Sequence, residues 1–378
     1  MTFPRNPKLR VLASYQSDRE VTADDRFIGP LMRLANRGHS IQIISSGITD
    51  PTGSLARHKV RKVPFPLFPS LPFLIQSFFV AFWITKKHCI DLFLVYREED
   101  LLIGWLVSKV TNCRIVYYAH GDSVTIQWIV SNSIVNKLKV SVLIIFEKIF
   151  LPKADLIVTV SRDTKLRLLR RVPLASSKIV VVYNNILSPV LRSRPLLKKN
   201  QRIIGFVGHF SNLKGVETLL RAFHLLTQSV NDVVLVLVGD GPLKKHLENM
   251  SIQMALEGKV IFTGYIKNPL DFIRDFDVLV VPSLYDGCPS VILEAFSLDI
   301  PVLGSKVGGI PELLGNGELL FSSMVKDDIA SKLELFLTSE KNQLTVKRII
   351  MERKKMFTFD HTSVIEQLFM QSAQENVT

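Results

Sequence analysis

The chain has 378 residues, 47% of them apolar and 21% charged, which excludes a disordered protein and predicts two domains with large cores. The net charge of +13 comes from the first half alone. Residues 1–190 hold 26 Lys and Arg against 13 Asp and Glu, whereas residues 191–378 hold 21 of each. We therefore expect the first domain to face something anionic, either nucleic acid or a lipid surface.

The beginning of the chain predicts a protein that stays in the cytosol. It is polar and interrupted by Pro4 and Pro7, and it lacks the apolar core of a secretory signal. The three cysteines, Cys89, Cys113 and Cys288, lie far apart and show no CxxC spacing. That distribution is typical of reduced thiols rather than of a disulfide or a zinc site.

The first half alternates short apolar runs with helical segments. Between the first two runs we predict a helix that is capped by Asp24 or Asp25, reaches Asn36 and is closed by Gly38. Strands that alternate with helices predict a parallel, doubly wound sheet. The predicted strands are Leu9–Ala13, Ser40–Ser45, Leu92–Tyr96, Ile115–Tyr118, Leu156–Val160 and Ile179–Tyr183.

An uncharged segment, Val63–Thr85, lies between two basic clusters. Its prolines leave about 13 helical residues from Phe73 on, roughly 20 Å, which is too short for the roughly 30 Å core of a bilayer. Two interpretations remain: a buried helix of the first domain, or a segment in the membrane interface whose basic flanks attract anionic lipids. Nucleic acid is disfavoured because the basic residues form no recognisable RNA- or DNA-binding motif with aromatic residues.

The second half repeats the alternation after Ser188–Gln201, a proline-containing stretch without periodicity that we interpret as an interdomain linker. Its strands are nearly all apolar, which indicates that helices cover both faces of their sheet. The predicted strands are Ile203–Val207, Val233–Val238, Val260–Phe262, Val278–Val281 and Val302–Gly304, with helices at 215–228, 242–256, 269–274 and 290–298. Ligands of such units bind beyond the carboxyl ends of the strands.

Two loop–helix junctions in the second half carry candidate chemistry. Lys214 stands at the first, beside a helix N-terminus whose N–H groups and dipole suit a phosphate, although a Gly–Lys pair there is often only a turn. The second is more specific, because Asp286 lies on the loop and Glu294 lies one turn into the helix. Glu294 is either a surface charge or a ribose ligand, and its apolar neighbours favour a carboxylate that needs a partner.

Short motifs follow one another along nearly the whole chain. Those of the second half are Phe206-Val207-Gly208, Lys214-Gly215, Val238-Gly239-Asp240-Gly241-Pro242, Phe262-Thr263-Gly264, Pro282-Ser283, Asp286 to Ala295, Pro301-Val302 and Gly308-Gly309-Ile310-Pro311-Glu312. Those of the first half are Arg37-Gly38-His39, His120-Gly121 and Asn184-Asn185. In this order the motifs resemble the retaining glycosyltransferase family 4 (glycosyl transferases group 1), more loosely in the first half than in the second.

The resemblance implies the α/β GT-B fold, in which two Rossmann-like, doubly wound parallel-sheet domains face each other across a cleft. Residues 1–190 would form the acceptor-side domain and residues 191–358 the nucleotide-sugar-binding domain. A last helix within residues 359–378, roughly Thr362–Ala373, would cross back onto the first domain.

The resemblance also implies a hexosyltransferase-type reaction. A sugar would pass, with retention of configuration, from a UDP- or GDP-sugar to a glycan or lipid-linked acceptor of cell-surface polysaccharide or lipopolysaccharide synthesis. Asp286 would contact the transferred sugar, His120 would lie near sugar and acceptor, and Glu294 would bind the ribose. The diphosphate would be bound by Lys214 with Gly208, His209, Gly287, Ser290 and Val291. No cofactor or metal is expected, since Lys214 and backbone N–H groups would take up the developing charge.

Three positions depart from the family pattern. His209 stands where the family has Arg, Asp286 where it has Glu, and Val21-Thr22 where it has two glycines. These departures support an alternative, a catalytically weak or inactive sugar-nucleotide-binding protein or partner subunit. A nicotinamide dehydrogenase is excluded because no strand is followed by G-x-G-x-x-G.

The triplet Asp275-Phe276-Asp277 has the form of the DxD motif that holds manganese in another glycosyltransferase fold. It leads directly into the strand Val278–Val281, so we interpret Asp277 as the end of a helix and the beginning of a strand. The sequence therefore predicts no metal site.

Overall fold

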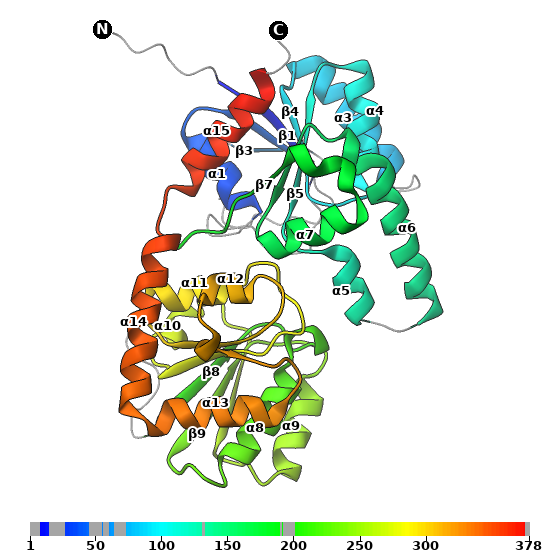
Figure 1. Ribbon diagram of the computed structural model, residues 1–378. Helices are drawn as coiled ribbons and strands as arrows, with labels where there is room; N and C mark the ends of the chain where they lie inside the picture. Colours follow the sequence, from blue (N-terminus) through cyan, green and yellow to red (C-terminus); the bar gives the residue numbers. More distant parts are fainter. Residues whose placement is uncertain are drawn as a thin grey trace, which may run out of the picture.

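The computed structural model describes residues 8–14, 27–44, 55, 60–63, 73–130, 133–189, 191 and 201–374. It contains two parallel sheets, each packed between helices, with one sheet above the other in Figure 1. The predicted α/β class with two doubly wound domains is confirmed.

The first sheet has seven parallel strands in the order β3-β2-β1-β4-β5-β6-β7. Helices α1 (Ile28–Asn36) and α15 (His361–Gln374) pack on one face, and α3 (Phe73–His88), α4 (Asp100–Val110) and α7 (Arg162–Arg171) pack on the other. The strands are β1 (Arg10–Ser14), β2 (Ser40–Ile44), β3 (Val60–Val63), β4 (Leu92–Val95), β5 (Arg114–Ala119), β6 (Leu156–Thr159) and β7 (Ile179–Val181).

Six of these strands lie close to their predicted positions, but β3 was not predicted. It is an edge strand with Arg61 and Lys62 in its middle, so it lacks the apolar run on which the other predictions rest. The expected caps of the first helix, Asp24 and Asp25, lie outside the described residues.

Helix α3 has two apolar faces. It begins where the prolines end, as predicted, and includes the basic residues that were expected to follow it. Val80 and Ile84 are buried against the first sheet, as the buried-helix interpretation requires. Phe79 and Trp83, in contrast, are 60% and 57% exposed. Within the described part of the chain, no helix is both long enough and apolar enough to span a bilayer.

The second sheet has six parallel strands in the order β10-β9-β8-β11-β12-β13. The strands are β8 (Arg202–Val207), β9 (Val233–Val238), β10 (Val260–Gly264), β11 (Val278–Val281), β12 (Val302–Ser305) and β13 (Leu320–Phe321). The helices are α8 (Val216–Leu226), α9 (Lys244–Gln253), α10 (Leu270–Ile273), α11 (Ser290–Ser297), α12 (Ile310–Leu314), α13 (Lys326–Thr338) and α14 (Glu340–Phe357). Helix α8 contacts α9 and α13, and α11 contacts α10 and α14.

The strand order of each sheet reverses at one point, between β1 and β4 in the first and between β8 and β11 in the second. Connections leave such a point in opposite directions, so ligands bind beside it, beyond the carboxyl ends of the strands. The loops after β8 and β11 therefore occupy the expected ligand-binding position of the second domain.

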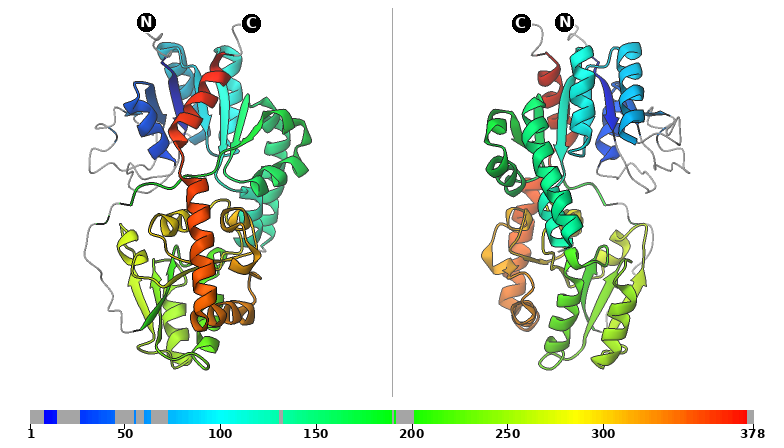
Figure 2. Two further views of the ribbon diagram at one scale, coloured as in Figure 1. Left: turned by 60° about the vertical axis from the view of Figure 1, so that its left-hand side comes forward. Right: turned by 90° about the vertical axis from the view of Figure 1, so that its right-hand side faces the viewer.

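Helix α15 follows α14 and packs against α1 of the first domain (Figures 1 and 2). Arg37 pairs with Asp360 at 2.8 Å and with Glu366 at 2.5 Å. The buried His361 lies with its Nε2 3.2 Å from the Tyr118 hydroxyl on β5. Burial, with the nearby Arg33 charge, lowers the pKa of His361 to about 4, so its imidazole is neutral at pH 7.

Candidate active site

The loops after β8 and β11 meet at an ion pair. The β8 loop turns through a short 3-10 helix, η3 (Asn212–Lys214), and the Leu284 N–H of the β11 loop donates to the Leu213 carbonyl at 2.8 Å. This contact places Lys214 Nζ 2.5 Å from Asp286 Oδ2, and both side chains are partly buried. The two residues that the sequence assigned to diphosphate and sugar thus neutralise each other.

Gly215 allows the two loops to approach this closely. Its φ of +65° lies in the left-handed region, and a Cβ there would stand 2.0 Å from the Pro282 carbonyl oxygen. A larger residue would push the β8 loop away from the β11 loop and separate Lys214 from Asp286.

The first domain brings His120 to the same place, at the end of β5. The imidazole of His120 stacks on the Tyr118 ring, with centroids 4.6 Å apart, and lies 4.2 Å from the Phe27 ring. The His120 carbonyl oxygen is so close to Gly287 that a Cβ there would lie 2.7 Å from it. The structure therefore joins His120, Gly287, Asp286 and Lys214 at one junction of the two domains.

Helix α11 begins just beyond that junction. Among the described residues no side chain caps it, and the first N–H groups of a helix have no partner within the helix. Ser290, Val291 and Glu294 are half-buried on its first two turns, while Ile292 and Leu293 are buried.

Gly208 and His209, the remaining residues predicted to bind the diphosphate of the sugar nucleotide, follow β8 directly. The Gly208 N–H donates to the Val238 carbonyl at 3.0 Å, so that group completes the sheet and does not face a ligand. His209 is exposed beside Gly241. Val21 and Thr22 lie outside the described residues.

The two halves of the chain match two family models. Residues 31–186 match Glycosyltransferase Family 4, and residues 189–354 match Glycosyl transferases group 1. The chain belongs to this glycosyltransferase family.

Named relatives of this glycosyltransferase differ in what they glycosylate. This chain is 24% identical over 310 residues, 78% of either chain, to the N-acetyl-alpha-D-glucosaminyl L-malate synthase of Bacillus anthracis. It is 27% identical over 305 residues, 78% of this chain and 79% of the other, to the N-acetylgalactosamine-N,N'-diacetylbacillosaminyl-diphospho-undecaprenol 4-alpha-N-acetylgalactosaminyltransferase of Campylobacter jejuni.

A solved structure confirms the GT-B fold. Anabaena Alr3699/HepE in complex with UDP superposes with a TM-score of 0.74 over 95% of this chain and 98% of that chain, at 19% identity.

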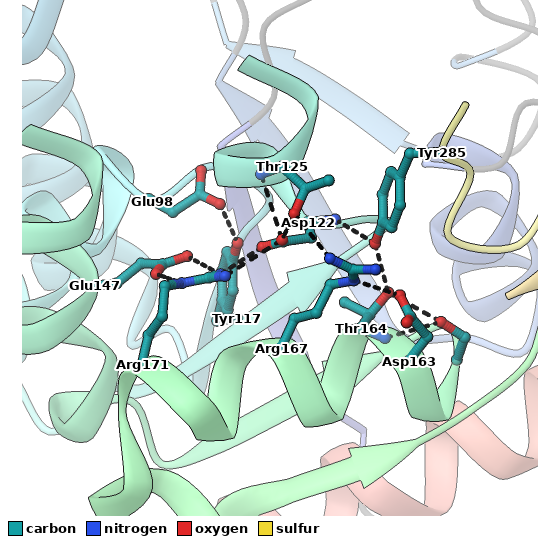
Figure 3. A network of polar contacts seen from close by, with 11 residues as sticks. Glu98, Tyr117, Asp122, Thr125, Glu147, Asp163, Thr164, Arg167, Arg171 and Tyr285 are labelled. Carbon is teal, nitrogen blue, oxygen red and sulfur yellow. Dashed lines mark hydrogen bonds and ion pairs between the residues drawn. The ribbon is translucent and has the colours of Figure 1, made fainter. Parts of the chain in front are cut away.

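A buried charged network of this glycosyltransferase includes Asp122 (Figure 3), which follows His120 by two residues in the loop after β5. Arg171 on α7 donates to Asp122 and, at 2.5 Å, to Glu147, and neither carboxylate side chain is exposed. Burial lowers the pKa of Arg171, but the hydrogen bonds to Glu147 and Asp122 outweigh it and raise that pKa overall. Arg171 is therefore a permanent cation that balances two buried carboxylates.

Tyr285 connects this network to the second domain (Figure 3). The Asp122 N–H donates to the Tyr285 hydroxyl at 3.0 Å, and the Arg167 guanidinium lies 5.1 Å from the Tyr285 ring centroid. Burial raises the pKa of Tyr285, so the hydroxyl stays protonated. Since Tyr285 precedes Asp286, the first domain holds the backbone next to the candidate sugar-contacting residue.

Glu312 makes a second bond between the domains. Its carboxylate accepts the N–H groups of Arg162 at 2.8 Å and Asp163 at 2.7 Å, in the first turn of α7, and the Tyr183 hydroxyl at 2.6 Å. A carboxylate from one domain thus caps a helix of the other. In the sequence Glu312 stands out only as the end of the Gly308–Glu312 motif, and no local pattern marks Tyr285 or Arg171, because their contacts join residues that are distant in sequence.

Asp277 lies at the amino ends of the strands of the second sheet. Its carboxylate accepts the Ile203 N–H at 2.7 Å, at the amino end of β8, whereas the candidate site lies at the carboxyl ends. Within the described residues, no group of three or more His, Cys, Asp or Glu side chains is placed to hold a metal.

Proposed function

We propose that this glycosyltransferase moves a sugar from a UDP- or GDP-sugar to a glycan or lipid-linked acceptor, with retention of configuration, in cell-surface polysaccharide or lipopolysaccharide synthesis. One observation carries the proposal: Lys214 and Asp286 pair at 2.5 Å where the strand order of the second sheet reverses. An ammonium and a carboxylate at that place suit a diphosphate and the sugar attached to it.

Donor binding would exchange the partners of this pair. The diphosphate carries more negative charge than one carboxylate, so it would take over Lys214 and release Asp286 to accept a hydroxyl of the sugar. The complex of HepE with UDP supports a uridine nucleotide as one donor class.

Charge that develops on the leaving diphosphate would be stabilised by Lys214 and by the N–H groups at Ser290 and Val291, which start α11. Glu294, one turn later, would accept the ribose hydroxyls, and His120 would lie near the sugar and the acceptor. We expect no metal ion in this step, since these groups already supply the positive charge.

The charge of the first domain favours one kind of acceptor. One relative is named for L-malate and another for a diphospho-undecaprenol. Membership of the family is therefore compatible with a small-molecule acceptor as well as with a lipid-linked one. The excess of basic residues in residues 1–190 favours the lipid-linked kind, with peripheral contact to an anionic membrane on its cytosolic side and no nucleic-acid partner.

Nucleotide protection tests the proposal. UDP or GDP should raise the thermal unfolding temperature of the wild type, and Glu294→Ala should remove that rise because the ribose loses its acceptor. Glu334→Ala, at an exposed glutamate of α13, is the matched control and should keep the rise. A wild type that neither nucleotide protects would refute the proposal.

The departures at His209 and Asp286 favour one other function, a sugar-nucleotide-binding protein or partner subunit without turnover. Radiolabelled UDP- and GDP-sugars separate the two. An enzyme releases labelled sugar slowly by hydrolysis even without an acceptor, whereas a binding protein is protected by the nucleotide but releases none.

A further inference from the structure

Helix α6 (Ile134–Phe150) exposes a row of apolar side chains that nothing in the described structure covers. The row, here called the α6 ridge, consists of Ile134, Leu138, Val142, Ile145 and Ile149, each at least 50% exposed. Spacings of three and four residues place them on one side of the helix. Val140 and Leu143 occupy the opposite side and are buried, so α6 has an apolar inner face and an apolar outer face.

The neighbouring helices extend this surface. Helix α6 contacts α4 and α5 (Ser123–Val130), and α4 contacts α3. Exposed apolar residues on α3, α4 and α5 include Trp83 at 57%, Val110 at 60% and Trp128 at 57%. Single exposed apolar residues are ordinary on a protein surface, but a row that continues over adjacent helices marks an interaction site.

The charges on this surface are all of one sign. Helices α3 to α6 contain two acidic residues, Asp100 and Glu147, and both are buried. The same helices contain six lysines, all exposed: Lys86, Lys87, Lys109, Lys137, Lys139 and Lys148. Lys87 Nζ also lies 4.6 Å from the centroid of the exposed Trp83 ring.

We infer that the outer face of α3, α4, α5 and α6 is a docking surface for an anionic bilayer, with the α6 ridge at its centre. The apolar side chains would enter the headgroup boundary and the lysines would contact lipid phosphates. Exposed tryptophans suit that depth, because the ring is amphipathic. A second copy fits worse, since a two-fold axis through this face would set lysines against lysines.

The docking surface leads to the candidate active site. Helix α5 begins three residues after His120 and contacts η3, which ends at Lys214. A protein seated on the bilayer through α6 would therefore hold the domain junction close to the headgroups. The position of the junction identifies the acceptor as one presented by the membrane. This statement about the acceptor rests on the proposed function and makes it more specific.

The proposed membrane contact thus lies mainly outside Val63–Thr85, the segment that the sequence suggested for it. Val63–Thr85 supplies the edge of the surface through Phe79 and Trp83, while the α6 ridge supplies more exposed apolar residues than α3, α4 or α5 does.

Flotation with vesicles of phosphatidylcholine, with and without phosphatidylglycerol, tests the docking surface at low salt without any sugar nucleotide. The wild type should float with the anionic vesicles and remain behind with the neutral ones. Leu138→Ser/Ile145→Ser should weaken binding by about tenfold or more. Leu335→Ser/Leu344→Ser, at exposed leucines of α13 and α14, is the matched control and should bind as the wild type does.

Charge reversal gives a second test that leaves the apolar residues intact. Lys137→Glu/Lys148→Glu should also lose about tenfold or more of the binding, whereas Lys341→Glu/Lys347→Glu on α14 should not. Equal loss in both charge variants would show general attraction by net charge and would overturn the proposal, as would a wild type that binds no vesicles. A dimer in solution that Leu138→Ser/Ile145→Ser dissociates would identify a second copy as the occupant instead.

The two proposals fail separately. Vesicle binding without protection by UDP or GDP would leave the docking surface standing and refute the proposed function. Protection by UDP or GDP without vesicle binding would refute the docking surface and leave the transfer from a nucleotide sugar standing.

Discussion

Lys214 and Asp286 satisfy each other in the ligand-free protein, and their exchange of partners is what donor binding would require. The pair is partly open to solvent, so it adds little to stability, and its effect should appear in ligand binding. A carboxylate beside the ammonium competes with an incoming diphosphate.

Asp286→Asn should therefore separate binding from turnover. Removing the competing charge should tighten UDP or GDP binding several-fold by calorimetry, while hydrolysis of the sugar nucleotide falls because the sugar loses its contact. Asp299→Asn is the control, since Asp299 forms a similar pair with Lys354 at 2.7 Å outside the site. Weaker nucleotide binding by Asp286→Asn would mean that Asp286 supports the diphosphate site rather than occupying it.

At the scale of elements, α7 carries the cation that permits two buried carboxylates under the His120 loop. Arg171→Met should leave Asp122 and Glu147 uncompensated and lower the free energy of unfolding by about 3–5 kcal/mol in urea denaturation. Arg170→Met, at the exposed neighbour on the same helix, should change it little. A small loss for Arg171→Met would indicate that water or proton uptake replaces the guanidinium.

The docking of α15 on the first domain should depend on pH through His361. Its pKa is about 4 in the folded protein and about 6.5 when unfolded. The unfolded state therefore binds a proton first, and the stabilisation present above pH ~6.5 is lost as the pH falls towards ~4, by about 3 kcal/mol.

Hydrogen exchange of α15 between these pH values measures this effect, and His361→Asn should flatten it. The variant is needed because Asp100 acts with the opposite sign. Burial raises its pKa to about 6, so its contribution to stability falls as the pH rises from ~4 to ~6. An unchanged pH profile in His361→Asn would assign the dependence to other groups.

For the whole molecule, polar contacts between facing loops join the two domains within the described part of the chain. Glu312 makes three of them, to the first turn of α7 and to Tyr183. Such a contact can break and re-form as ligands enter and leave, whereas a large apolar interface would not.

Glu312→Gln should shift the protein towards a more open arrangement of its domains. The neutral amide is a weaker acceptor for helix N–H groups and for the Tyr183 hydroxyl. Small-angle scattering should show a larger radius of gyration than in the wild type, and Glu318→Gln, at an exposed glutamate of the same domain, should match the wild type. Identical scattering from all three proteins would show that other contacts hold the domains together.

The sequence by itself determined the fold class, because strands covered on both faces must be apolar throughout and their runs are visible without a structure. It also located Lys214, Asp286 and Glu294, since a loop that ends a strand and begins a helix has a recognisable pattern. The domain boundaries at 190 and 358 and the roles of the site residues stay predictions.

Only the tertiary structure decided which residues meet. The edge strand β3 forms by pairing with β2 despite its charged middle, and Asp122 reaches Tyr285 across the domain junction. The α6 ridge has the same local periodicity as a buried face, and only the structure shows that none of the described elements packs on it. Contacts and exposure depend on how distant segments come together, which a local pattern does not encode.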